Sequence, residues 1–66
     1  MNSKGYKHMV QESYTRYIME INKTSGYNHD NATHYESLYR KYKSKLKDLG
    51  IETKKNELDQ IYFKEN

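Results

Sequence analysis

Apolar residues recur every three or four positions in two long stretches of the chain, the spacing that places them on one face of a helix. In the stretch over residues 33–49 this face consists of Tyr35, Leu38, Tyr39, Tyr42, Leu46 and Leu49. In the stretch over residues 6–22 it consists of Tyr6, Met9, Val10, Tyr14, Tyr17 and Ile21. Both stretches therefore predict amphipathic helices that each bury one apolar stripe.

Both ends of the second predicted helix carry recognisable signals. Thr33 and Glu36 form the pattern of a capping box, in which each side chain accepts a hydrogen bond from the backbone N–H of the other residue. Gly50 suits the left-handed conformation that ends a helix, and Ile51 then folds back onto Leu46. We therefore place this helix between Thr33 and the residue before Gly50.

The residues outside these two helices complete the predicted fold. Residues 1–5 show no periodicity and are expected to be disordered. Residues 23–32 contain turn formers and predict a loop that lays the two helices side by side and antiparallel.

A short third helix is expected over residues 54–64. Leu58, Ile61 and Tyr62 have helical spacing there, and Thr53 is a suitable N-cap. The sequence thus predicts an all-α fold, an antiparallel helical hairpin plus a short third helix, in one small domain that spans residues 1–66.

Size and composition limit how such a domain is stabilised. A chain of 66 residues has a thin core, and without cysteine it forms no disulfide. Eight tyrosines supply much of the apolar surface, and tyrosine favours half-buried positions where its hydroxyl stays wet or paired. We expect the stability to come from helix packing, from a homo-oligomer or from a partner.

The charge is mildly basic, with 12 lysines and arginines against 9 acids, a net charge of +3 and a pI near 9.1. This balance permits nucleic-acid binding without requiring it. No apolar run is long enough to span a membrane, and no apolar segment follows the N-terminus as in a signal peptide. We therefore expect a cytoplasmic protein with no membrane span.

A row of cations on the second predicted helix supports the first functional hypothesis. Arg40, Lys43 and Lys47 flank the apolar stripe on one side, and Lys54 and Lys55 would extend this ridge at the start of the third helix. Helix N-termini and cationic ridges attract phosphate, so these five residues are the candidate contacts with nucleic acid. The alternative is a solvated face whose lysine stems cover the edges of the core.

The second hypothesis is a protein-binding inhibitor or adaptor. The candidate contacts are Ile18, Met19, Tyr27 and Phe63, because Met19 points away from the apolar stripe, Ile18 lies at its margin and tyrosine is a frequent hot-spot residue. The first hypothesis is a small regulator on DNA or RNA. Its phage or plasmid type is suggested by a composition rich in Lys, Asn, Tyr and Ile, which is typical of AT-rich coding sequence. The sequence does not choose between a nucleic acid and a larger protein as the partner.

Residues 42–61 resemble the SAP-type helix–extended-loop–helix DNA-binding module. The resemblance rests on Tyr42, Leu46, Gly50-Ile51, Lys54-Lys55, Glu57-Leu58 and Ile61. The family places apolar residues at the spacing of Tyr42 and Leu46 before a Gly-Leu pair, then a loop, a lysine and a Glu-Leu pair. Here the loop is shorter and lacks the glycine that precedes the lysine, so the chain is not assigned to the family.

Chemistry at a metal or catalytic site is not predicted. His29 and His34 do not have the spacing that brings two imidazoles to one helical face, and His8 is remote in sequence. No glycine-rich phosphate loop or cysteine nucleophile is present, and so short a chain cannot wall off water. We therefore expect a non-enzymatic binding module without a cofactor or metal.

Overall fold

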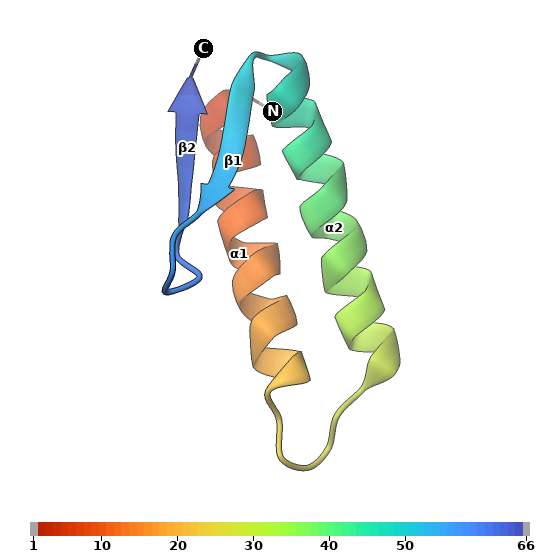
Figure 1. Cartoon of the computed structure of the whole chain (residues 1–66). Coiled ribbons are helices and arrows are strands. Elements are labelled where there is room, and N and C mark those ends of the chain that lie inside the picture. Colours follow the sequence, from red (N-terminus) through yellow and green to blue (C-terminus); the bar gives the residue numbers. More distant parts are fainter. Residues whose placement is uncertain (1, 66) are drawn as a thin grey trace.

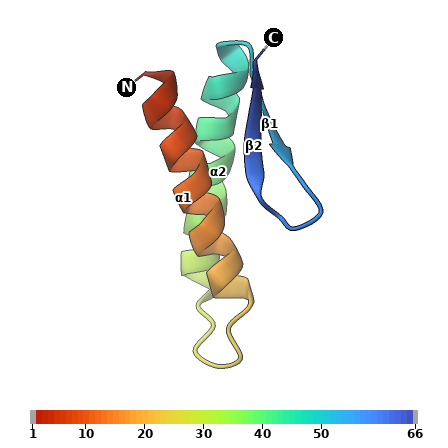
Figure 2. The ribbon, with the colours of Figure 1, turned by 90° about the vertical axis from the view of Figure 1, so that its left-hand side faces the viewer.

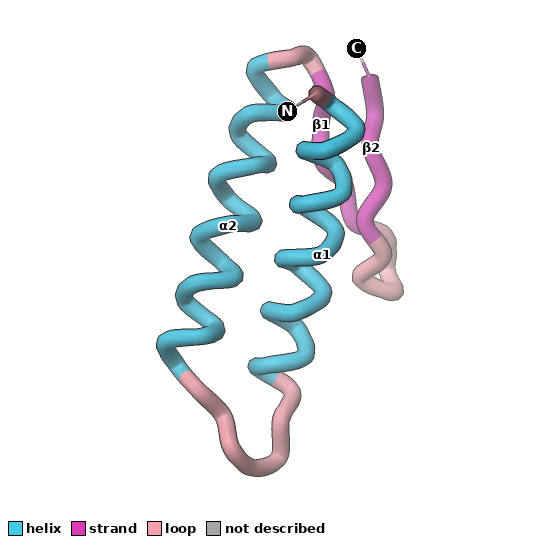
Figure 3. The backbone as a smooth tube through the Cα atoms, turned by 180° about the vertical axis from the view of Figure 1, so that it is seen from behind, coloured by secondary structure: helices cyan, strands magenta, loops and turns pink. Residues whose placement is uncertain are grey.

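The computed structural model, which describes residues 2–65, contains two long helices followed by a β-hairpin. Helix α1 spans Ser3–Ile21 and helix α2 spans His29–Asp48, while strand β1 spans Ile51–Lys55 and strand β2 spans Ile61–Glu65. The two helices are antiparallel, and the hairpin covers one face of them (Figures 1 and 2). The molecule therefore consists of a helical layer and a strand layer. Figure 3 shows from behind that the two strands lie beyond α1.

The predicted helical hairpin is present, but α1 begins earlier than expected. The side chain of Asn2 accepts a hydrogen bond from the backbone N–H of Gly5 at 3.0 Å, which caps the helix before Ser3. The expectation of disorder over residues 1–5 is therefore wrong for the described residues 2–5, and Met1 lies outside the described residues.

Helix α2 also begins earlier, at His29 rather than at Thr33. The side chain of Asn28 accepts from the backbone N–H of Asn31 at 3.0 Å and is the N-cap. Thr33 lies inside the helix with an exposed side chain, so the predicted capping box is wrong. Asparagine ranks above threonine as an N-cap, and its position here adds a further turn to the helix.

The predicted C-terminus of α2 is confirmed. Gly50 has φ +80° and donates its backbone N–H to the carbonyl of Lys47 at 2.9 Å. A left-handed conformation is costly for residues with a Cβ, which explains the glycine. Beyond it, Ile51 is buried and packs in one cluster with Leu46.

The predicted third helix is wrong, and with it the all-α fold class. Strands β1 and β2 pair antiparallel, with Thr53 opposite Phe63 and Lys55 opposite Ile61. Alternate side chains of both strands are buried or half-buried against the helices, namely Ile51, Thr53, Ile61 and Phe63. Leu58, which was expected in the core, is 77% exposed at the turn. The buried residues of the segment follow the two-residue period of a strand, and the helical spacing of Leu58, Ile61 and Tyr62 covers only a short stretch.

Residues 56–60 connect the strands, and a three-residue loop lies between Asn56 and Gln60. The carbonyl of Asn56 accepts from the N–H of Asp59, and the N–H of Asn56 donates to the carbonyl of Gln60, both at 3.1 Å. Asp59 has φ +59°, so the loop is a turn followed by a left-handed residue, a common hairpin geometry. The resemblance to the SAP-type module therefore does not extend to structure, because no helix follows Gly50 within the described residues.

The core lies where the hairpin meets the two helices. Val10, Leu46 and Ile51 form a buried cluster, against which half-buried side chains pack: Tyr6, Tyr39, Tyr42, Ile61 and Phe63. One buried residue comes from each helix and one from β1. The tyrosines surround this cluster rather than fill it, as expected for rings that carry a hydroxyl.

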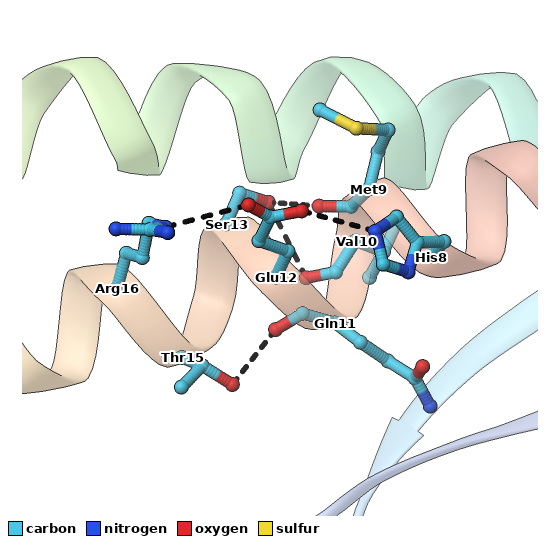
Figure 4. A network of polar contacts seen from close by, with 8 residues as sticks. All are labelled: His8, Met9, Val10, Gln11, Glu12, Ser13, Thr15 and Arg16. Atoms are coloured by element: carbon cyan, nitrogen blue, oxygen red, sulfur yellow. Dashed lines mark hydrogen bonds and ion pairs between the residues drawn. The ribbon is translucent and has the colours of Figure 1, made fainter.

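Several polar side chains in the middle of α1 find their partners within the helix (Figure 4). Ser13 is 2% exposed, and its hydroxyl donates to the carbonyl of Met9 at 2.6 Å, so a small polar residue is buried without an unpaired group. On the solvent side, Glu12 contacts His8 at 3.1 Å and Arg16 at 3.4 Å. These contacts are one helical turn apart and support the helix itself.

A buried carboxylate ties the two helices together at the loop. Glu20 is 4% exposed, and its carboxylate accepts from the backbone N–H of Asn28 at 3.1 Å. It also pairs with Lys23 at 2.9 Å and accepts from the side chain of Asn31 at 3.4 Å. The hydrogen bond from Lys23 lowers the pKa of Glu20, and this effect exceeds the opposing effect of burial.

We expect the stability of the fold to depend on pH through Glu20. Its pKa in the folded chain is below the usual 4.5, so the ionised carboxylate stabilises the fold above that pH, and this stabilisation is lost as the pH falls through the folded pKa. Glu20→Gln should therefore lower the melting temperature at pH 7, and the difference from the parent should shrink in acid. Melting curves by circular dichroism at pH 7 and in acid measure the difference in melting temperature between parent and variant. An equal difference under both conditions would contradict this prediction.

The position of the N-cap gives a second prediction. Asn28→Ala should destabilise the protein by about 1 kcal/mol, because it removes the acceptor for the N–H of Asn31. Thr33→Ala is the control and should change stability by less than about 0.5 kcal/mol, because Thr33 is an exposed residue inside the helix. Urea unfolding compares both variants with the parent. A larger effect at Thr33 than at Asn28 would mean that α2 begins at Thr33, as its sequence pattern predicts.

Candidate functional site

Three of the five predicted nucleic-acid contacts lie together in a groove between α2 and β1. Arg40, Lys43 and Lys47 form one wall with Ser44, and residues 50–53 form the other wall. We call it the basic groove, and its volume is about 700 Å³. The three cations share a wall because their spacing places them on one side of α2.

The cations of the basic groove differ in their local partners. Arg40 pairs with Glu36 one turn earlier at 3.3 Å, which offsets part of its charge. The ammonium of Lys43 lies 5.5 Å from the ring centre of Tyr39. Within the described part of the chain Lys47 makes no ion pair. Glu52 on the opposite wall pairs with Lys54 at 2.9 Å, so the groove has a net positive charge.

The other two predicted contacts, Lys54 and Lys55, do not line this groove. They belong to β1, so the helix N-terminus expected to add attraction for phosphate does not exist. Lys54 lies on the outward face of the hairpin beside Glu52, which raises the pKa of Lys54. Successive residues of a strand point to opposite faces, which explains why these neighbours separate.

Lys55 instead helps to attach the hairpin to the helices. Its ammonium donates to the hydroxyl of Tyr14 at 3.4 Å and lies 5.0 Å from the centre of that ring. The same hydroxyl donates to Asp59 at 3.2 Å, and the ring packs on Tyr39 with centroids 5.2 Å apart. Because its hydroxyl oxygen accepts from the ammonium, Tyr14 raises the pKa of Lys55.

The wall formed by β1 is also the unpaired edge of the sheet. The hydrogen bond from Asn56 to Gln60 sets the alternation, so the next residue pair, Lys55 and Ile61, is not hydrogen-bonded. The backbone groups of Ile51, Thr53 and Lys55 consequently point away from β2. Within the described residues no backbone or side-chain partner occupies them.

Thr53 carries a second unsatisfied group in this wall. Its hydroxyl oxygen is buried and has no hydrogen-bond partner among the described residues. A buried hydroxyl without a partner is costly, and native proteins keep few of them. Thr53 thus contributes unpaired backbone groups to the β1 wall of the basic groove, whereas its unpaired hydroxyl oxygen is buried.

The four predicted protein contacts do not form one patch. Met19 is 64% exposed and Tyr27 is 51% exposed, and Ile18 is half-buried. Phe63 packs on the core, where the ammonium of Lys7 lies 5.7 Å from its ring centre. Lys7 and Met19 are separated by about 18 Å along α1. An adaptor surface made of these four side chains together is therefore not present in one place.

The strand edge was missed in the sequence, although a signal for it exists. Two short runs have an apolar or β-branched residue at every second position, Ile51 and Thr53 in the first and Ile61 and Phe63 in the second. The turn formers Asn56 and Asp59 lie between these runs. Two alternating runs joined by such a turn predict a hairpin. Two strands alone always leave two unpaired edges, which makes an edge site predictable once the hairpin is recognised.

Comparison with known proteins does not assign this chain to a family. No family model, no curated protein and no solved structure matches it. The described residues contain no group of three or more His, Asp or Glu side chains placed to hold a metal ion. No helix among residues 2–65 is long and apolar enough to cross a membrane.

Tyr14→Phe tests how the hairpin is attached. The ring should keep its place against Tyr39, whereas the hydrogen bonds to Lys55 and Asp59 are lost. We expect a loss of about 1 kcal/mol in unfolding free energy and a fall in the pKa of Lys55 toward its usual value. Chemical denaturation and NMR titration of the lysine side chain measure these two effects. An unchanged pKa would contradict the proposed role of the hydroxyl.

Proposed function

We propose that this protein is a non-enzymatic binding module that holds a larger protein partner in the basic groove. The observation that carries the proposal is the juxtaposition of a cation row with an unpaired strand edge. Arg40, Lys43 and Lys47 face residues 50–53 across one open surface. Cations there attract an acidic partner, and strand edges give affinity through main-chain hydrogen bonds.

The chemistry of the strand edge favours a protein over a nucleic acid. Thr53 and Lys55 present backbone N–H donors and carbonyl acceptors in alternation along β1. A phosphate chain offers acceptors only, so it would leave those carbonyls unsatisfied and close to negative charge. A polypeptide satisfies both kinds of group.

The charge distribution points the same way. Three cations rather than five line the groove, and Arg40 already has a carboxylate partner. Nucleic-acid affinity comes largely from the number of phosphate contacts, so three contacts support only weak binding. A protein partner needs fewer charges because strand pairing and side-chain packing add to the affinity.

The lining of the basic groove also supports a binding role rather than catalysis. It contains one carboxylate, Glu52, which is engaged by Lys54, and it contains no histidine. General acid–base chemistry needs a proton donor or acceptor positioned in a site that excludes water. An open groove with basic side chains supplies a recognition surface instead.

Nucleic acid remains the second candidate, because one observation favours it. Arg40, Lys43 and Lys47 rise along α2 by about 4.5 Å and 6 Å, a spacing that suits successive groups of one anionic strand. In that case salt should weaken binding with a log–log slope of about three, and the loss of all three cations should remove this slope.

Charge removal in the groove tests the proposed function. The variant with Arg40→Gln, Lys43→Gln and Lys47→Gln keeps a helix-favouring residue at each position, so circular dichroism should be unchanged. Immobilised protein would be exposed to a nuclease-treated extract of its own source cells. We expect the triple variant to retain about tenfold less of any captured protein partner than the parent, from the summed loss of three charge contacts.

The matched control is Lys41→Gln with Lys45→Gln on the other side of α2. These cations lie over Tyr42 and Tyr6 and do not line the basic groove. The control should retain the partner like the parent. Equal losses from both sides would mean nonspecific charge attraction, and capture that disappears with nuclease would favour the nucleic-acid candidate.

A further inference from the structure

The strand layer is narrower than the helical layer beneath it. Two packed helices are about 20 Å wide, whereas two strands about 4.8 Å apart cover about half of that width. In this structure β1 is the strand beside α2, and β2 is the strand farther from α2 (Figure 1). The strand layer therefore ends at β1 and leaves the neighbouring surface of α2 uncovered.

The uncovered surface of α2 is charged and polar, so it is not an exposed part of the apolar core. The exposed side chains that α2 contributes there are Arg40, Lys43, Ser44 and Lys47. A further strand in the same layer would place alternate side chains directly over these cations. Charge complementarity therefore requires acidic side chains at those positions.

The edge of β1 is available for such a strand. The backbone groups of Ile51, Thr53 and Lys55 point toward the uncovered side, and the Thr53 hydroxyl lacks a partner among the described residues. An added strand would pair the backbone groups.

We propose that an extended acidic segment of the partner protein adds to β1 as a third strand and lies over α2. This inference rests on the proposed function and specifies its binding mode. Alternate side chains of a strand are about 6.7 Å apart, and Lys43 and Lys47 are about 6 Å apart along the helix axis. Acids at two or three alternate positions of the segment therefore pair with Arg40, Lys43 and Lys47.

A second copy of this chain is a poorer occupant of the same edge. Pairing β1 with β1 of another copy would bring the cation rows of two α2 helices to the same side of a joined sheet. Residues 51–55 and 61–65 also carry no run of alternating acids, since lysines occupy Lys54, Lys55 and Lys64. Like charges would oppose this association.

The test uses a defined peptide and two backbone-modified forms of the protein. The probe is an end-capped peptide of alternating Glu and Val, about six residues long. One protein form carries an N-methyl group on the amide of Thr53, which removes an outward donor of β1. The matched form carries it on Phe63, which removes an outward donor of β2, and both leave the hydrogen bonds between β1 and β2 intact.

We expect the peptide to bind the Phe63-modified form within about twofold of the parent and the Thr53-modified form about tenfold more weakly. In the parent, hydrogen exchange of the amides of Ile51, Thr53 and Lys55 should slow when peptide is added. The outward amides of Ile61, Phe63 and Glu65 should not respond. A peptide with Lys in place of Glu should not bind.

The outcomes separate this inference from the proposed function. Equal effects of the two N-methyl groups, or no protection along β1, would overturn strand addition even if the triple Gln variant still loses its partner. Stronger binding of an oligothymidylate than of the peptide would overturn both proposals and favour nucleic acid. The exchange measurement on unmodified protein keeps the test decisive if a modified form fails to fold.

Discussion

The packing of Leu46 against Val10 and Ile51 is the contact on which the rest of the structure depends. Leu46 and Val10 are completely buried, and they bring the end of α2 against α1. Gly50 then reverses the chain within a few residues, so that Ile51 enters the same cluster from the strand layer. In so thin a core, loss of one such side chain removes a large share of the buried apolar surface.

The aromatic and cationic residues of this protein serve the fold together. Tyrosine rings surround the small buried cluster, and lysines lie over several of them, with Lys45 5.9 Å from the ring centre of Tyr6 and Lys41 5.4 Å from that of Tyr42. Such contacts contribute about 0.5–1 kcal/mol at exposed sites. Much of the basic charge is therefore part of the packing, and a count of lysines overstates the charge offered to a ligand.

The basic groove is a consequence of the same packing. Because Ile51 must join the core, β1 runs beside α2, and its unpaired edge faces the side of the helix that carries Arg40, Lys43 and Lys47. The cations alone do not distinguish a protein from a nucleic acid. The proposed protein partner rests on the edge beside them, because a polypeptide chain can pair with both the donors and the acceptors of β1 while its acidic side chains pair with the cations.

Local sequence determined the two helices, the glycine that ends α2 and the side of α2 on which Arg40, Lys43 and Lys47 lie, because helical period and backbone conformation depend on near neighbours. It did not determine the partners of Lys54 and Lys55, or the separation of Phe63 from Met19, because these depend on how the hairpin docks. Leu58, Ile61 and Tyr62 have helical spacing, whereas Ile61 and Phe63 have the spacing of a strand, and over so short a stretch the two patterns coexist. Burial of Ile51 and Phe63 against the helices decided between the two patterns in favour of the strand, and this burial is a tertiary contact.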